Sequence, residues 1–170
     1  MTDEPRELFN VVNEQDEVIG EAFRADVHAQ GLRHRAVSIF VFNNAGQLLM
    51  QLRSATKDEY PSCWTSSCSG HVDAGEDYDT AAHRELMEEL GLSARLEYLT
   101  KLPAGPETAN EFTVLYRTTA DEIPALHPDE IERVEFVDID VIIRRVKQQP
   151  DEYTPPFRSL LEWYVRNNVP

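Results

Sequence analysis

The sequence predicts an α/β (α+β) domain in which helices cover both faces of a mixed β-sheet, giving three layers. Two observations carry this prediction. A chain of 170 residues is the size of one ordinary domain and can bury a core without disulfides or a structural metal. The expected strands and helices alternate without the regular βαβ rhythm of a doubly wound parallel fold. We therefore expect residues 1–170 to form a single domain.

The first third of the chain is predicted to be mainly strand. Two apolar runs surround a polar turn in residues 8–23, which is the pattern of a β-hairpin. Residues 38–42 and 47–52 flank a second turn whose sequence is Asn-Asn-Ala-Gly. We expect an N-terminal hairpin ahead of a core that spans about residues 33–148.

Helical spacing is clearest in residues 77–90, where Asp77 can cap the start and Gly91 can take a left-handed conformation at the end. Strands are then expected at 111–116 and 132–137, followed by a short amphipathic helix at 139–147. A C-terminal helix is expected at about 155–168, with Thr154 as its N-cap and prolines in its first turn.

Charge limits the partners. The chain carries 31 acidic and 16 basic side chains, a net charge of −15, which repels nucleic-acid polymers. A small phosphorylated substrate remains compatible, because bound cations invert the electrostatics where carboxylates gather. No apolar run is long enough for a membrane span, and the start MTDEPRELFN lacks a signal-peptide pattern. We expect a cytoplasmic protein, as a monomer or a homodimer, that does not contact a membrane.

The helix at 77–90 combines an apolar face with an acidic one. The apolar face holds Ala82, Leu86 and Leu90, and the acidic face holds Glu85, Glu88 and Glu89. Like charges three and four residues apart destabilise a helix by roughly 0.2–0.5 kcal/mol per pair. A divalent cation would remove this repulsion, and Mg²⁺ prefers carboxylate oxygens. The acidic face is either a metal site or solvated surface.

The spacing of the residues before and within this helix decides between a metal site and a solvated surface. Gly70, five residues, Glu76, seven residues and then Arg84-Glu85-Leu86-x-Glu88-Glu89-x-Gly91-Leu92 match the Nudix box at every constrained position. The chain therefore resembles the Nudix hydrolases. From the residues alone, we expect Gly70 to permit a turn that brings its carbonyl near an ion, and Glu76 to suit the helix N-terminus. We expect Arg84 to hold a carboxylate by two hydrogen bonds and Gly91 to close the helix.

The resemblance implies the Nudix α/β/α sandwich and a site that binds Mg²⁺ or Mn²⁺ through Glu85, Glu88, Glu89 and Gly70. It also implies that metal-positioned water attacks phosphorus and cleaves a diphosphate linkage, with one glutamate as general base. Glu111, at the start of a predicted strand, is the candidate base outside the box. Nucleoside 5′-di- or triphosphates, or nucleoside diphosphate derivatives, are the first substrates to test, because no further motif for a coenzyme is apparent.

Over residues 8–140 the chain also resembles the isopentenyl-diphosphate-isomerase branch of this superfamily, in segments that include Tyr60-Pro61-x-x-Trp64-Thr65-Ser66 and Gly70-His71. Those isomerases use a cysteine immediately before the Gly-His pair, where this chain has Ser69. Cys68 would point to the opposite face of a strand. The isomerases also have an acidic metal ligand at the position two residues before Glu111, and this chain has Ala109 there. The isomerases keep only part of the Arg-Glu-x-x-Glu-Glu sequence, whereas this chain has all of it. We therefore favour hydrolysis as the activity, with isomerisation as the alternative.

Several residues keep two interpretations. His28, His34 and His71 correspond to metal ligands of the isomerases, or they are hydrogen-bonding residues near the sheet. Arg53 and Lys57 are either anchors for a diphosphate or a surface pair. Tyr60 and Trp64 either stack on a base or belong to the core. A third function, an inactive nucleotide-binding module, is opposed by the intact glutamates.

Overall fold

A computed structural model describes residues 6–167 and 169 of the chain. Four α-helices and two short 3₁₀ helices accompany nine strands in this part of the chain. The helices are α1 (Arg24–Gln30), α2 (Tyr78–Leu90), α3 (Ile139–Gln148), α4 (Pro155–Arg166), η1 (Pro106–Thr108) and η2 (Pro150–Glu152). The strands are β1 (Leu8–Val12), β2 (Val18–Phe23), β3 (His34–Phe42), β4 (Leu48–Arg53), β5 (Trp64–Thr65), β6 (Cys68–His71), β7 (Glu97–Leu102), β8 (Glu111–Thr119) and β9 (Ile131–Val137).

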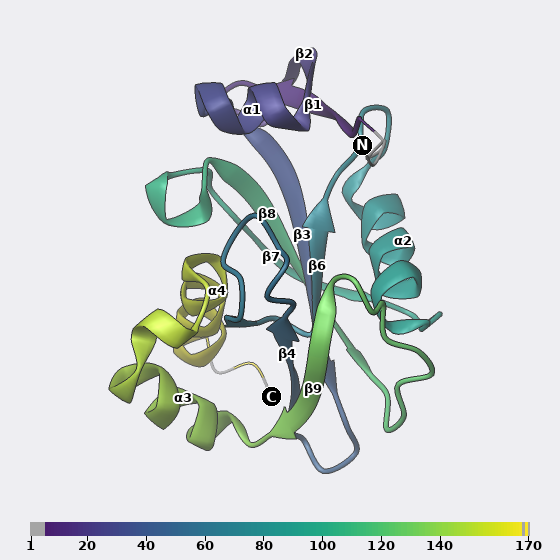
Figure 1. The fold of residues 1–170 in the computed structure, drawn as a ribbon, viewed down its shortest axis with the longest axis vertical. Coiled ribbons are helices and arrows are strands. Elements are labelled where there is room, and N and C mark those ends of the chain that lie inside the picture. The colour runs from purple at the N-terminus through teal and green to yellow at the C-terminus, as the bar shows by residue number, and fades with distance from the viewer. Residues whose placement is uncertain (1–5, 168, 170) are drawn as a thin grey trace.

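The main sheet is mixed, as the sequence predicted. Its strands follow the order β5-β4-β3-β8-β7, while β6 also pairs with β3 and β9 with β4. Only the pairing of β3 with β8 is parallel among these strands, and the other pairs are antiparallel. β3 is thus the central strand, and Figure 1 shows it running through the middle of the molecule.

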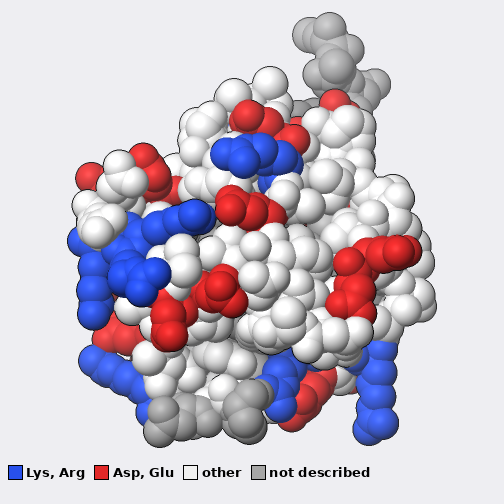
Figure 2. All heavy atoms as spheres, turned by 90° about the horizontal axis from the view of Figure 1, so that it is seen from below, with Lys and Arg blue, Asp and Glu red and all other residues white. Residues whose placement is uncertain are grey.

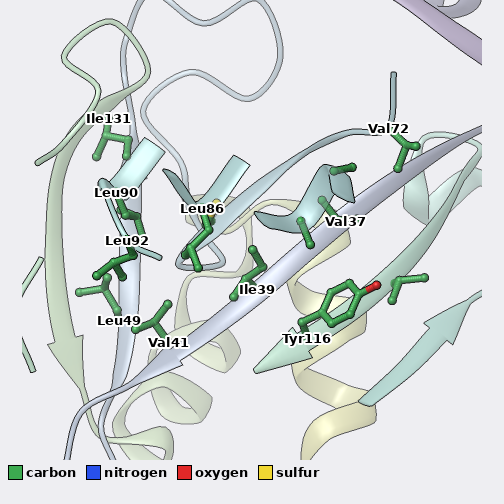
Figure 3. Close-up of a cluster of buried hydrophobic side chains, with 14 residues drawn as sticks. Val37, Ile39, Val41, Leu49, Val72, Leu86, Leu90, Leu92, Tyr116 and Ile131 are labelled. Atoms are coloured by element: carbon green, nitrogen blue, oxygen red, sulfur yellow. The ribbon is translucent and has the colours of Figure 1, made fainter. Parts of the chain in front are cut away.

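Helices cover both faces of this sheet, which confirms the predicted sandwich. Val37, Ile39 and Val41 of β3 point to the face covered by α2 and pack with Leu86 and Leu90 of that helix (Figure 3). Phe40 and Phe42 point to the other face, where Ile142 of α3 and Phe157, Leu160 and Leu161 of α4 complete a second core. A strand that is buried on both faces needs a nearly continuous apolar run, and residues 36–42 supply one that only Ser38 interrupts.

The predicted helix ends are observed with their caps. The Asp77 side chain accepts a hydrogen bond from the backbone N–H of Thr80 at 2.7 Å, and Gly91 has a φ of 65°. The Thr154 side chain likewise accepts from the backbone N–H of Phe157 at the start of α4. That helix ends at Arg166, and residue 168, the end of the predicted helix, lies outside the described residues.

β1, β2 and α1 form an N-terminal unit at one end of the sandwich, shown at the top of Figure 1. The hairpin was predicted, but α1 was not. Val27 is the only buried residue of this seven-residue helix, so its sequence lacks an apolar stripe. The unit contacts the sandwich through an isolated bridge between Phe9 and Asp73 and through the side chain of Asp16.

The surface mixes charges of both signs despite the net charge of −15. Figure 2 shows one face, on which basic side chains gather beside acidic ones on the side where α3 lies. In the described part of the chain, every helix is too short or too polar to cross a membrane.

Candidate active site

Arg84 organises the segment that matches the Nudix box. Its guanidinium donates to both carboxylate oxygens of Glu76, from Nε at 2.9 Å and from Nη2 at 2.7 Å, which is the two-pronged contact that was expected. It also donates to Glu85 at 2.8 Å, to Glu88 at 3.3 Å and to the backbone carbonyl of His71 at 3.1 Å. These bonds attach α2 to the loop before it and to β6. They also offset the repulsion within the acidic face.

Gly70 has a different role from the one expected. It lies within β6 and pairs with Val37 in β3, so it does not form a turn. A Cβ atom at this position would collide with the carboxylate of Glu85. Glycine is needed here because the Glu85 carboxylate packs directly against the strand backbone.

Glu85 and Glu89 face the same cleft, which Gly70 and Ser69 also line. Glu89 is only 4% exposed and accepts hydrogen bonds from the backbone N–H of Ser69 at 3.1 Å and from Gln51 at 3.3 Å. Burial raises the pKa of Glu85 to about 8, against the opposing effect of Arg84, and burial also raises the pKa of Glu89. Two shielded carboxylates with raised pKa values suit a bound cation, which would stabilise their charged forms.

Glu88 is separated from the other two glutamates. Its side chain is 55% exposed, is paired with Arg84 and does not line the cleft. The structure thus brings together Glu85 and Glu89, two of the three predicted carboxylate ligands. The third, Glu88, lies on the outer side of the helix, away from the cleft.

Glu130 joins this group, although no motif or spacing in the sequence pointed to it. It precedes β9, lines the cleft and further raises the pKa values of Glu85 and Glu89 through its negative charge. Its carboxylate lies 3.7 Å from the ammonium nitrogen of Lys57. The signal that could have identified it is an acidic residue close to the start of a predicted strand, because Glu130 lies two residues before the strand expected at 132–137 and Glu111 is the first residue of its own.

Three histidines from different elements meet beside these carboxylates. His28 of α1, His34 of β3 and His71 of β6 place one ring nitrogen each within 4.8 Å of one another. Hydrogen bonds join Glu111 Oε1 to His34 Nε2 at 3.2 Å and to His71 Nε2 at 2.9 Å. The Nε2 of His28 is buried without a hydrogen-bond partner among the described residues. Three imidazoles and one carboxylate fit a transition-metal ion, so the metal-ligand interpretation has a geometric basis.

Glu111 is held by this cluster. Burial alone would raise the pKa of its carboxyl group, but the hydrogen bonds and charges of His34 and His71 hold that pKa at about 2. Burial lowers the pKa of His28 and favours its neutral form, which is the form that binds metals. Glu111 therefore lies in the predicted site, but its carboxylate is a weak base in this arrangement.

The two predicted cations also line the cleft. Arg53 donates from Nε and Nη2 to the backbone carbonyl of Glu59, at 3.0 and 2.9 Å, and so braces the loop between β4 and β5. Tyr60 in that loop lines the cleft as well, whereas Trp64 packs against the second core with Arg133 over its ring. Of the two aromatics that were considered for base stacking, only Tyr60 is placed for it.

Cys68 and Ser69 point in opposite directions, as expected for neighbours on a strand. Cys68 is fully buried in the core beneath α2, where burial and the nearby Glu89 raise the pKa of its thiol. Ser69 lines the cleft. A hydroxyl thus occupies the position at which the isomerases are expected to present a thiol.

A sandwich with two shielded glutamates on a helix beside a cleft has the ligands that a divalent cation needs to bind next to a phosphorylated molecule. Residues 32–164 match the NUDIX domain family, and the chain belongs to it. Members of this family in general cleave diphosphate linkages and use divalent metal ions.

Among the named relatives, some are isomerases and others are named as Nudix hydrolases. A Photorhabdus laumondii protein named isopentenyl-diphosphate Delta-isomerase 2 is 35% identical over 160 residues, covering 91% of this chain and 90% of the relative. A Yersinia pestis protein named as an uncharacterized Nudix hydrolase is 33% identical over 164 residues, covering 95% and 88%. The crystal structure of DR0079 from Deinococcus radiodurans is 30% identical, with a TM-score of 0.76 over 84% of this chain and 90% of that one.

Proposed function

We propose that this protein hydrolyses a diphosphate linkage in a small phosphorylated substrate, with nucleoside 5′-di- or triphosphates and nucleoside diphosphate derivatives as the first candidates. The observation that carries the proposal is the pair of buried carboxylates, Glu85 and Glu89, on a cleft where Ser69 replaces the thiol that isomerisation would use.

The residues divide into two groups by charge. Glu85 and Glu89, with the carbonyl of Gly70, would hold Mg²⁺ or Mn²⁺, while Glu88 supports this group from outside through Arg84. A cation bound there neutralises charge on the diphosphate and lowers the pKa of a water molecule. Lys57 and the side of Arg53 that faces the cleft would hold phosphate oxygens.

The reaction forms a bond from the water oxygen to phosphorus and breaks the bridging P–O bond, so that a phosphate or phosphate ester leaves. A carboxylate takes the proton of the attacking water. The pKa of about 2 makes Glu111 a poor acceptor, so we assign this role to Glu85, Glu89 or Glu130 and assign Glu111 to the histidine cluster.

Hydrolysis is tested with a phosphate-release assay over nucleotides and their conjugates, in Mg²⁺ and in Mn²⁺. Glu85→Gln and Glu89→Gln should each lower kcat by about a hundredfold or more, because each removes a charge that holds the cation. Glu88→Gln should have a smaller effect. Glu162→Gln, an exposed glutamate of α4, serves as the control. Undiminished turnover in both Glu85→Gln and Glu89→Gln would exclude this site.

Isomerisation of isopentenyl diphosphate is the second candidate, and the histidine cluster with Glu111 is the observation that favours it. The same preparations should be assayed for isomerisation in parallel. We expect none in the wild type, because the Ser69 hydroxyl is a far weaker acid than a thiol. Isomerisation without phosphate release would instead make the protein an isomerase that uses another acid.

A further inference from the structure

Gln51 is a polar residue in the interior of the molecule. It lies on β4, where it pairs with Thr65 of β5 on one side and with Val134 of β9 on the other, and only 2% of its surface is exposed. A buried amide costs free energy unless its N–H groups find acceptors. The contacts of this side chain therefore show why a polar residue is kept at this position.

The Gln51 amide joins the short link between β5 and β6 to the acidic helix α2. Its Nε2 donates to the backbone carbonyl of Ser67 at 3.1 Å and to Oε2 of Glu89 at 3.3 Å. Ser67 is fixed in turn, because its hydroxyl donates to the carbonyl of Leu49 at 2.6 Å and accepts from the backbone N–H of Val41 at 2.9 Å. The N–H that Gln51 directs at Glu89 thus has a set position.

Glu89 is held through one of its two carboxylate oxygens. The backbone N–H of Ser69 donates to the same Oε2 at 3.1 Å, so the two N–H donors share one oxygen. Oε1 has no N–H donor among the described residues. The thiol of Cys68 also lies beside this carboxylate, but a thiol is a weak donor. Oε1 is therefore the oxygen that Glu89 can offer to a cation in the cleft.

Glu85 is held in a similar way. Arg84 donates to its Oε1 at 2.8 Å, whereas no donor in the described part of the chain reaches its Oε2. Both carboxylates line the cleft, and each presents one free oxygen. This arrangement suits Mg²⁺, which is small and keeps several waters in an octahedral shell. Ca²⁺ is larger, takes about six to eight oxygens and often binds both oxygens of a carboxylate.

We propose that Gln51 is a positioning residue that restricts Glu89 to one cation-binding oxygen and so makes the site prefer Mg²⁺ to Ca²⁺. This inference rests on the cation site of the proposed function. Without the Gln51 donor, the Glu89 carboxylate is held by the Ser69 N–H alone and can turn both oxygens toward the cleft. Such a carboxylate suits Ca²⁺ and crowds the octahedral shell that Mg²⁺ demands.

Calorimetric titration of the full chain with Mg²⁺ and with Ca²⁺, without substrate, tests this role. Wild type should bind Mg²⁺ more tightly than Ca²⁺. Gln51→Met keeps the length of the side chain and removes the amide. Its dissociation constant for Mg²⁺ should rise by about tenfold, because loss of a hydrogen bond to a metal ligand weakens a site by about 10–100-fold. Its dissociation constant for Ca²⁺ should stay the same or fall.

Two further variants locate the ion and control for the substitution. Glu89→Gln should lose most of the binding of both ions. Gln47→Met makes the same change in the turn between β3 and β4, where the Gln47 side chain accepts from Asn43 at 3.0 Å and does not line the cleft. It should leave both dissociation constants unaltered. A general loosening of the fold would weaken both ions alike, so the ratio of the two constants separates positioning from a structural role.

Infrared difference spectra of wild type provide a measurement that does not depend on the folding of Gln51→Met. The antisymmetric and symmetric stretches of a carboxylate lie further apart when one oxygen binds a metal ion than when both oxygens bind it. Addition of Mg²⁺ should therefore produce a pair of bands with the wide separation, and Glu89→Gln should remove that pair.

Three results would overturn the role of Gln51. One is tighter binding of Ca²⁺ than of Mg²⁺ by wild type. Another is an unchanged ratio of the two dissociation constants in Gln51→Met, and the third is a narrow separation of the bands that Mg²⁺ produces. If no nucleotide or conjugate releases phosphate while the metal results hold, hydrolysis fails and the role of Gln51 stands. If wild type binds neither ion, both proposals fail.

Discussion

Glu85 and Gly70 show how one side chain determines the place of another. The carboxylate of Glu85 occupies the space that a Cβ at position 70 would need, while Arg84 holds it from the other side at 2.8 Å. The carboxylate is the far end of a flexible side chain, so it can move aside if position 70 gains a methyl group. The fold would survive that change, but the cation site would not keep its geometry.

Gly70→Ala should therefore reduce metal affinity more than stability. We expect the Mg²⁺ concentration for half-maximal phosphate release to rise by about tenfold, since a displaced ligand weakens a metal site. The midpoint of thermal unfolding should change little. Gly20→Ala, where a Cβ meets no atom within 4 Å, is the matched control. An unaltered Mg²⁺ dependence in Gly70→Ala would mean that Glu85 does not bind the cation.

Sequence spacing identified the glutamates of the box, but it did not rank them. Periodicity placed Glu85, Glu88 and Glu89 on one face, and only tertiary contacts decide that Glu89 is buried while Glu88 is paired outside. Glu130 lies outside any spacing rule. Its role depends on a loop that reaches the cleft from a distant part of the chain.

At the scale of elements, the sequence predicted the helices that have capping residues and a periodic apolar pattern. α2 has both, and it begins and ends where Asp77 and Gly91 indicate. α1 ends at the left-handed Gly31, but it has no side-chain N-cap and buries only Val27, and β7 also buries little of its surface, so neither element has an apolar pattern. β6 is short, and its sequence Cys-Ser-Gly-His has no apolar alternation, so its place beside β3 comes from tertiary pairing.

Asp16 connects the turn between β1 and β2 to three other elements through one carboxylate. It lies in the turn between β1 and β2, and it accepts hydrogen bonds from Arg35 of β3 at 2.7 Å, Tyr78 of α2 at 2.7 Å and Lys101 of β7 at 2.8 Å. Burial alone would raise the pKa of Asp16, but these three partners lower it below its usual value. The N-terminal unit therefore depends on a charged carboxylate.

Asp16→Asn should destabilise the protein by about 2 kcal/mol at neutral pH, because a neutral amide replaces an ion with charged partners. The pKa of Asp16 is lower in the folded chain than in the unfolded chain, so its charge stabilises the fold at every pH above the unfolded-state value. This stabilisation is lost as the pH falls through the folded-state pKa. Wild type should thus lose its advantage over Asp16→Asn below about pH 4. Urea unfolding at pH 7 and pH 3 measures this difference.

The exposed Asp26, in the same N-terminal unit, is the control, and Asp26→Asn should have an effect below about 1 kcal/mol. A difference between wild type and Asp16→Asn that stays constant from pH 7 to pH 3 would contradict the assigned role of the Asp16 charge.

At the scale of the whole molecule, the histidine cluster joins the N-terminal unit to the sandwich. His28 belongs to α1, whereas His34 and His71 belong to strands of the main sheet. Phe9 of β1 stacks on His71 with ring centroids 4.6 Å apart, so the same histidine contacts both parts. The resemblance to the isomerases suggested these ligands, but only the fold shows that they bridge the two parts.

An ion bound by these histidines should stabilise the whole fold, because it would bind the folded chain far better than the unfolded one. At a hundredfold excess over the dissociation constant, Mn²⁺ or Zn²⁺ would add about 2.7 kcal/mol, which raises the unfolding temperature by roughly 5–10 °C for a chain of this size. His28→Gln should lose most of this shift, and His83→Gln, an exposed residue of α2, should keep it. If Glu89→Gln abolishes the shift and His28→Gln leaves it intact, the stabilising ion lies at the glutamates. The histidines then serve only to orient Glu111.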